Sequence, residues 1–295
     1  MVQQALPRQD TILGLTTALT AIAGRVALPE PVAKAAQQVL AVRLNLDAGR
    51  PGGAEVRAAI QQSGVFQEAL LAGGRGTAAA GDLKSALLAL RQGLAGWLGN
   101  QAPVAQVSGV QPPLRGQLPR ARAGEAITQD LPDDPMDLAK HLMERSEAAL
   151  SRLRLHQNAS LPDPNPLRQE AQWSMDLPVV IGGQQHILHM QIQRDAEKDG
   201  ERSGDRGWQV RFAINLAERG EAGAQISLRG KNTGVLIWAE HAETANMLAS
   251  AVEDLRTDLS AVGLVPGAIV VRTGPPAEQP SQPVGQAGHI VDARR

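Results

Sequence analysis

The sequence predicts an α+β protein: a helical N-terminal region followed by a mainly antiparallel sheet packed on one long helix, with a disordered linker and tail. Two patterns support this prediction. Before residue 100, apolar residues recur three and four positions apart, which gives a helix one apolar side. After residue 173, apolar and polar residues alternate along several short segments, as in strands that bury one face. The chain therefore divides into a helical part and a sheet domain.

The helical region is expected at residues 31–99, behind an N-terminal segment at 1–30. Pro31 opens the first helix, residues 55–62 and 65–72 give two shorter ones, and Asp82 caps the strongest, whose leucines line one side. Three such helices can bury one another's apolar sides as a small bundle. In the N-terminal segment, residues 11–24 predict an ordinary helix rather than a cleaved secretory signal, because Asp10 and four threonines dilute the apolar run.

Proline, glycine and glutamine mark the connections. Residues 100–131 are expected to be a flexible linker and 275–295 a disordered tail, because both contain few large apolar residues. Asp134 and Pro135 form an N-cap and first-turn pair that starts a helix within 132–158. That helix is expected to be largely solvated and to lie against one of the domains. A proline-rich hinge at 159–172 follows it.

The α+β domain is expected at residues 173–274. Gly182 and Gly183 connect the two strands of a first hairpin, and the charged stretch 193–207 is predicted to be a disordered, exposed loop. Three more strands follow, at 208–216, 224–228 and 235–238. A helix from Ala245 to Val262 and a closing strand complete the domain.

The order of these parts carries a resemblance. It lies in the strand that begins at Trp208, the glycine-bearing turn at 220–223, and the texts WAEHAET, LASAVEDLRTDLSAVGL and IVVRTG. From about Trp173 to Gly274 the chain resembles the C-terminal domain of the flagellar hook-length control protein family. The texts RAAIQQSGVFQEALLA and GDLKSALLALRQGL resemble a helical segment upstream in many members. Where members usually carry a Pro-Glu-Glu-Leu-Gly turn, this chain has LAERGEAG.

The resemblance implies flagellar hook-length control. An exported N-terminal region would gauge the growing hook, and the C-terminal domain would bind the cytoplasmic domain of the flagellar export-gate switch protein. That binding would change type III export from hook to filament substrates. Hook and hook-cap subunits are further implied partners, and the protein would be cytoplasmic before export and then secreted through the flagellar apparatus. The alternative is a cytoplasmic scaffold or regulator that uses the same binding domain and is never exported.

Composition and spacing argue against other classes. A net charge of −1 does not favour a nucleic-acid partner, and no apolar run approaches the roughly 20 residues that span a bilayer. The chain has no cysteine, so disulfides and thiol catalysis are excluded. Glu240 and His241 sit at a strand-to-helix junction, but a carboxylate in a first helical turn needs no catalytic explanation. No enzyme, cofactor or metal site is expected; His186 and His189, three apart on a strand, point to opposite faces.

The features expected to recognise a partner are exposed connections. The turn between the strands at 208–216 and 224–228 is acidic and glycine-rich, and the charged loop at 193–207 is the other candidate. The interaction residues predicted from this reasoning are Glu218, Arg219, Gly220, Glu221, Gly223 and Trp238.

Overall fold

The computed structural model describes residues 5–47, 49, 51–74, 81–99, 110–121, 131–162, 170–195 and 206–276. The statements below concern these residues. The predicted tail beyond residue 276 and most of the predicted charged loop lie outside the described residues, so the expectation of disorder there is not addressed.

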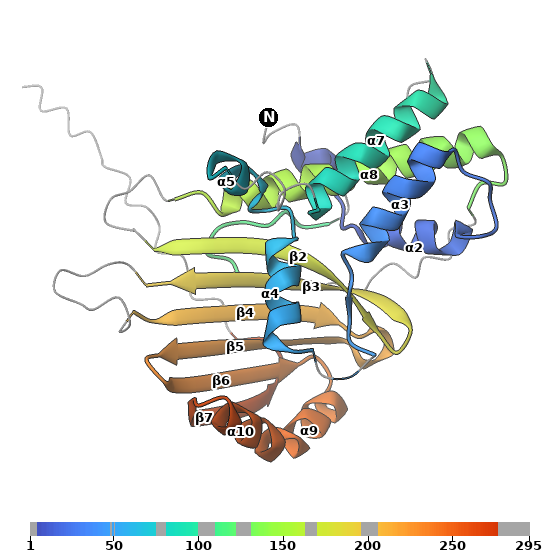
Figure 1. The fold of residues 1–295 in the computed structure, drawn as a ribbon. Coiled ribbons are helices and arrows are strands. Elements are labelled where there is room, and N and C mark those ends of the chain that lie inside the picture. The colour runs from blue at the N-terminus through green and yellow to red at the C-terminus, as the bar shows by residue number, and fades with distance from the viewer. Residues whose placement is uncertain are drawn as a thin grey trace, which may run out of the picture.

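The described strands form one seven-stranded sheet in the order β1-β2-β3-β4-β5-β6-β7 (Figure 1). Neighbours from β2 to β6 are antiparallel, while β1 pairs parallel to β2 and β7 parallel to β6. The strand bounds are β1 Leu44–Asn45, β2 Ala171–Ile181, β3 Gln184–Arg194, β4 Trp208–Asn215, β5 Glu221–Arg229, β6 Asn232–Ala239 and β7 Val265–Thr273. With its helical N-terminal region and mainly antiparallel sheet, the protein is α+β, as predicted.

Glycines fix the first hairpin. Gly182 and Gly183 both have positive φ, 59° and 71°, which a two-residue type I′ turn between β2 and β3 requires. The backbone N–H of Gly183 donates to the Asp47 carboxylate at 2.8 Å. That contact connects the hairpin to the segment that follows β1, a parallel edge strand that the sequence did not predict.

One face of the sheet is apolar and carries a core of its own. Its buried members are Met175, Leu177 and Met190. Ile60 of α4 (Gly53–Gln61), Val65 just after that helix and Leu153 of α8 pack on them. Figure 1 shows α4 crossing this face. Strand alternation therefore buries one face here, as the period of two predicts.

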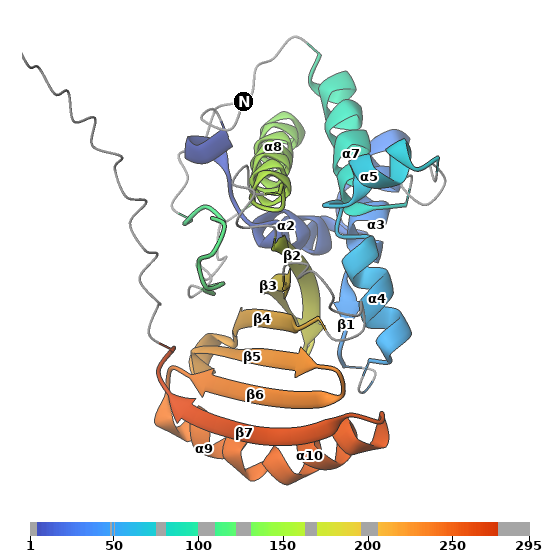
Figure 2. The same ribbon diagram turned by 90° about the vertical axis from the view of Figure 1, so that its left-hand side faces the viewer.

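Four helices form the larger core at the β2 end of the sheet (Figures 1 and 2). They are α2 Leu13–Ile22, α3 Glu30–Ala41, α7 Leu83–Leu98 and α8 Pro135–Ala159. Each cap behaves as its sequence predicts: the Asp82 side chain accepts from Ser85 N, and the Asp134 side chain accepts from the N–H groups of Met136 and Asp137. The short helix α5, Gln67–Ala72, lies beside this group in Figure 1. Leu15, Val32, Leu90 and Leu142 are among the most deeply buried residues of this core.

The expectation of a largely solvated helix at 132–158 is wrong. Helix α8 packs against α7, α2 and β2, and buries polar as well as apolar side chains. The sequence shows charges along much of α8, but three of these polar residues, Arg145, Arg152 and His156, point into the structure.

The expected single long helix after β6 is two helices. Helix α9, Ala242–Ser250, ends at Ala251, and α10, Val252–Ala261, begins immediately after it. Ala245 is buried and Leu248 packs beside it, but no residue of α10 is buried and Val262 is 73% exposed. The apolar stripe predicted along the whole segment is therefore covered at its start and largely open towards its end.

The stretch of the predicted linker that is described lies against the sheet. Residues 110–121, called the strap below, run along the face opposite α4, where Figure 2 shows them in green. Arg115 in the strap donates to the carbonyls of Leu161 and Glu170, at 2.6 and 2.7 Å. The strap therefore bridges the end of α8 and the start of β2.

Candidate functional site

The predicted interaction turn is a tight bend supported by the next junction along the chain. The 3-10 turn η2, Ala217–Arg219, leads into Gly220, whose φ of 72° favours glycine. A Cβ at Gly220 would lie 2.8 Å from Glu240 Oε2 and 2.8 Å from His241 Nε2. Glycine is therefore required twice at this position, for its conformation and for the close approach of the β6–α9 junction.

Glu240 supports the start of β5. Its Oε2 accepts the backbone N–H of Glu221 at 2.9 Å, and its own backbone N–H donates to the Glu221 carbonyl at 2.7 Å. Thr244, in the first turn of α9, donates its hydroxyl to the carbonyl of Arg219 at 2.9 Å. Glu240 thus has a structural partner at the position where a catalytic pair had been considered.

The six predicted interaction residues separate into exposed and buried groups. Glu218 and Arg219 are exposed, and the Arg219 guanidinium reaches Met247 Sδ at 3.6 Å. Glu221 is 6% exposed and Trp238 is 1% exposed, and both lie in strands rather than in the turn. Gly223 also lies within β5, directly opposite Trp238 of β6.

The indole of Trp238 packs directly over Gly223. A Cβ there would stand 2.2 Å from Trp238 Cζ2 and 2.7 Å from the carbonyl oxygen of Phe212. The ring also packs with Ala121 of the strap and Ala213 of β4. A large aromatic side chain can therefore lie flat on the strands only because the residue beneath it has no side chain.

The carboxylate of Glu221 is held by the strap. Arg120 donates from Nε to both oxygens, at 3.1 and 3.0 Å, and from Nη2 to Oε2 at 2.9 Å. The backbone N–H of Ala121 adds a fourth bond, to Oε1 at 2.8 Å. This is a bidentate guanidinium–carboxylate pair, the geometry that arginine forms best.

The strand register places a second group of charged residues on the same face. Asp176, His189, Ala213, Gly223 and Trp238 are successive cross-strand neighbours from β2 to β6, and directly opposite residues share a face. One end of this row is Trp238, whose indole packs on Gly223 as described above. The other end meets α8.

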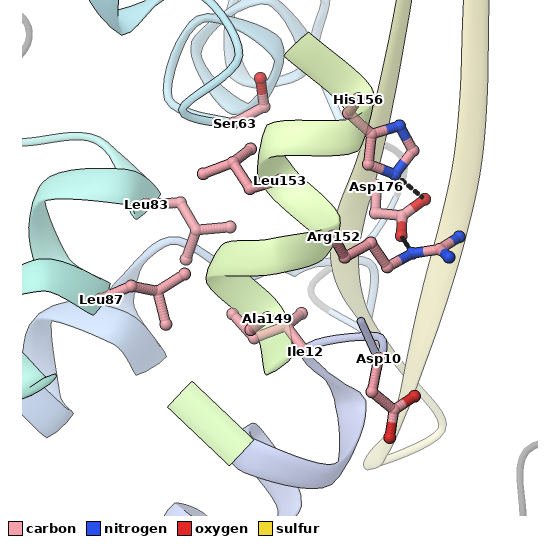
Figure 3. Close-up of a pocket in the computed structure, with 10 residues that line it drawn as sticks. All are labelled: Asp10, Ile12, Ser63, Leu83, Leu87, Ala149, Arg152, Leu153, His156 and Asp176. Carbon is pink, nitrogen blue, oxygen red and sulfur yellow. Dashed lines mark hydrogen bonds and ion pairs between the residues drawn. The ribbon is translucent and has the colours of Figure 1, made fainter. Parts of the chain in front are cut away.

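At the α8 end, Asp176 is buried among three cations or potential cations. Arg152 Nε donates to its Oδ2 (Figure 3), and His189 Nδ1 lies 2.6 Å from its Oδ1. His156 Nε2 lies 3.1 Å from Oδ1, within ion-pair distance but outside hydrogen-bond geometry, while its Nδ1 contacts the Ser174 hydroxyl at 3.0 Å. The Arg152 guanidinium also donates to Gln9 Oε1 and to the carbonyl of Gln111 in the strap.

The charge states of this cluster follow from burial and from Arg152. Burial alone would raise the pKa of Asp176, but the Arg152 guanidinium, with His156 and His189, holds it well below its ordinary value. Burial lowers the pKa of His156 despite the opposing attraction of Asp176. Because His156 is thus neutral near pH 7, the Arg152–Asp176 pair is the charge interaction that dominates.

A cavity of about 20 Å³ lies beside this cluster, lined on the helical side by Leu83, Leu87 and Leu153 (Figure 3). It has room for about one water molecule and none for a substrate. Among the described residues, no group of three or more His, Asp or Glu side chains is arranged to hold a metal ion. The cluster therefore joins the helical region to the sheet.

Sequence reasoning missed this cluster because its members are far apart in the chain. His156 was expected to be solvated, which is wrong, since it is 4% exposed. His189 was considered only for a metal site with His186, and the two do lie on opposite faces, with His186 Nδ1 2.7 Å from the Asn215 carbonyl. The available signal was Asp176, the one ionisable residue in a largely apolar strand.

Fold and site together define a class of protein. The described part contains a sheet domain with the strap on one face, a glycine-supported turn beside the strap, and an edge strand, β7, that has no strand partner among the described residues. These are features of a binding module. None of the described helices is both long and apolar enough to cross a membrane.

Comparison with known proteins gives a family match for the C-terminal part of the chain. Residues 196–280 match the family described as flagellar hook-length control protein FliK, and the C-terminal part of this chain is a hook-length control domain of that family. The match takes in β4 to β7 with α9 and α10, but not the β2–β3 hairpin, where the resemblance had been placed from residue 173. Comparisons with curated proteins and with solved structures give no match.

Proposed function

We propose that this protein controls flagellar hook length by switching the substrates of the flagellar type III export apparatus. Its C-terminal domain would bind the cytoplasmic domain of the export-gate switch protein, ending hook export and starting filament export. The N-terminal region, exported first, would report the length of the hook. The observation that carries the proposal is the family match at residues 196–280.

The architecture is compatible with docking by the C-terminal domain. Strand β7 is the last strand of the sheet, and its outer edge has no strand partner among the described residues. Val265 and Val270 on that strand are about half exposed. An edge of this kind can accept an extended segment of a partner through backbone hydrogen bonds.

Export would require the helical region to come apart. Helix α8 connects the helical core to the sheet through Arg152 and Asp176, whose side chains are 8% and 9% exposed. Passing the first 160 residues through an export channel means separating this pair. The proposal therefore predicts that export of the N-terminal region removes α8 from the polar face of the sheet and breaks the Arg152–Asp176 pair.

The test is genetic. Deleting the gene from a flagellated host should give abnormally long hooks without filaments, and restoring it should return hooks of normal length with filaments. The protein should appear in the culture supernatant and disappear from it when the export gate is deleted. Normal hooks and filaments in the deletion strain would refute the proposal.

Whether the protein stays in the cell distinguishes the non-exported alternative from hook-length control by export. A protein that stays in the cell while its deletion still alters filament assembly would indicate a non-exported scaffold or regulator. A useful control is a chain that ends before β4, which should lose switching even if it is exported, because the family-matching residues are gone.

A further inference from the structure

The strap lies across the polar face of the sheet from β2 to β5. Its Gly116 N–H donates to Gln172 Oε1 on β2 at 3.3 Å, and its Gln117 carbonyl accepts from Gln191 Nε2 on β3 at 3.2 Å. It ends with Arg120 and Ala121 on Glu221 of β5. A single short segment thus forms hydrogen bonds with side chains on three different strands.

The strap has the character of a bound peptide rather than of core. Ala121 is its one buried residue; of its two leucines, Leu114 is 48% exposed and Leu118 is half-buried. Three prolines, Pro112, Pro113 and Pro119, keep it out of helix and sheet, and it bends once, at residues 115–117, where Gly116 has a φ of 79°. Its hydrogen bonds to the sheet and the Arg120–Glu221 pair are polar contacts, and Ala121 adds an apolar contact with Trp238.

Glu221 is built to receive a guanidinium. It is 6% exposed, and among the described residues every partner of its carboxylate belongs to the strap. If the strap leaves, the carboxylate loses its cation and all four of these hydrogen bonds, and another donor of the same kind would restore them. The empty site would therefore favour a guanidinium group, which is positively charged and planar and can donate two hydrogen bonds to one carboxylate.

The strap also leaves parts of the same face unsatisfied. Gln172 Nε2 and Trp238 Nε1 are buried donors with no hydrogen-bond partner among the described residues. Gln172 is 3% exposed and lies under the strap at β2, while the Trp238 indole packs against Ala121. Unpaired buried donors are costly, so an occupant that supplies two acceptors would bind this face better than the strap does.

We propose that this face is a docking site for an extended segment of a partner protein that carries an arginine followed by a small residue, and that the strap occupies it until the partner arrives. The arginine would replace Arg120 on Glu221, the small residue would replace Ala121 against Trp238, and acceptors on the segment would pair with the two unsatisfied donors. This inference rests on the proposed function, because it specifies the partner chemistry of the hook-length control domain.

The anchors of the strap suggest when it would leave. Gln9 Nε2 donates to the Val110 carbonyl, and Arg152 donates to the Gln111 carbonyl at 3.1 Å. Both donors belong to the helical region. Unfolding that region, as export requires, removes these anchors and weakens the hold of the strap on the polar face.

The test uses a fluorescent peptide copying residues 110–121, VQPPLRGQLPRA, and anisotropy titrations with the full chain. The native strap should compete strongly, because it is held at high effective concentration. The Arg120→Ala chain, with Glu221 vacated, should bind the peptide at least tenfold more tightly than the native chain. A peptide with alanine in place of the second arginine should bind that variant at least tenfold more weakly.

Two matched changes keep the result interpretable. Adding Glu221→Gln to the Arg120→Ala chain should abolish binding, whereas adding Glu253→Gln, which removes an 83% exposed acid on α10, should leave binding unchanged. Circular dichroism and thermal melting of each variant establish that it is folded. Because the chain has no cysteine, Gln117→Cys with Gln191→Cys and a short bismaleimide can lock the strap in the otherwise native chain, which should remove residual peptide binding.

The outcomes separate clearly. Peptide binding that is indifferent to Glu221→Gln, or no tighter in the Arg120→Ala chain than in the native one, would overturn the docking site. So would a strap-exchanged dimer of the Arg120→Ala chain in analytical ultracentrifugation, because the occupant would then be a second copy. Peptide binding as expected in a protein whose deletion leaves hooks normal would retain the docking site and refute hook-length control.

Discussion

Replacing Gly223 with alanine should destabilise the sheet, although alanine usually suits a strand better than glycine. The new methyl group would lie 2.2 Å from Trp238 Cζ2 and 2.7 Å from the Phe212 carbonyl oxygen. The carbonyl belongs to β4, paired with β5 on the same ladder, and the indole is 1% exposed, so neither can simply move away. Overpacking of this kind costs about 1–3 kcal/mol.

A glycine on the next strand provides the control. At Gly234 a Cβ meets nothing closer than the Ala268 carbonyl at 4.0 Å. Gly234→Ala should therefore be neutral or stabilising by up to about 1 kcal/mol, because it only reduces the freedom of the unfolded chain. The two variants make the same chemical change on adjacent strands and differ only in what the methyl group meets.

Thermal and urea unfolding followed by circular dichroism measure the difference. At roughly 2–4 °C per kcal/mol for a chain of this size, Gly223→Ala should lower the melting temperature by roughly 2–12 °C and Gly234→Ala should not. Tryptophan fluorescence should report a changed environment in the first variant. Equal melting temperatures for the two variants would show that the indole does not lie over Gly223 as the structure has it.

Three further predictions concern the junction and the terminal helix. Arg152→Met should cost about 3–5 kcal/mol by removing the permanent cation beside the buried Asp176 carboxylate, and adding Asp176→Leu should recover much of that loss; additive effects in this double-mutant cycle would contradict a direct pair. Burial lowers the pKa of His156, so the unfolded chain takes up its proton first, and stability should fall as pH drops below its ordinary value of 6.5. The urea midpoint should fall less between pH 7.5 and 5 in His156→Gln, whereas Asp176, with its pKa well below the ordinary 3.8, should keep its contribution over that range. Leu255→Asp should cost only about 1–2 kcal/mol, because Leu255 is half-buried; a loss comparable to that of Arg152→Met would indicate a more deeply packed α10.

The α10 prediction shows how far periodicity reaches. Spacing of three and four residues correctly places a helical stretch after β6, but it cannot show whether anything covers the apolar side. Here the sheet ends at β7, so Ala245 near the start of the stretch finds a core and Val262 at its end does not. The spacing of apolar residues depends on one segment alone, whereas their burial also depends on a second segment that covers them.

The interaction turn shows the same limit. The glycines and acids of LAERGEAG correctly indicate a bend, but the sequence does not show that β5 begins at Glu221, or that Arg120, a hundred residues earlier, occupies its carboxylate. Sequence distance hides such pairs, since only the fold brings residues from a predicted linker onto a strand. The Asp176 cluster, drawn from α8, β2 and β3, was hidden for the same reason.

The sequence by itself determined what depends on neighbours along the chain: the caps at Asp82 and Asp134, the Gly182–Gly183 hairpin, the alternating strands, and the order of parts that marks the hook-length control family. Only the tertiary structure decided which faces meet. Registering β2 to β6 placed Asp176, Gly223 and Trp238 on one face, and packing α8 and the strap against that face gave its buried charges their partners. Local propensity fixes an element within a few residues, but pairing of buried charges requires the low-dielectric surroundings that only the assembled fold creates.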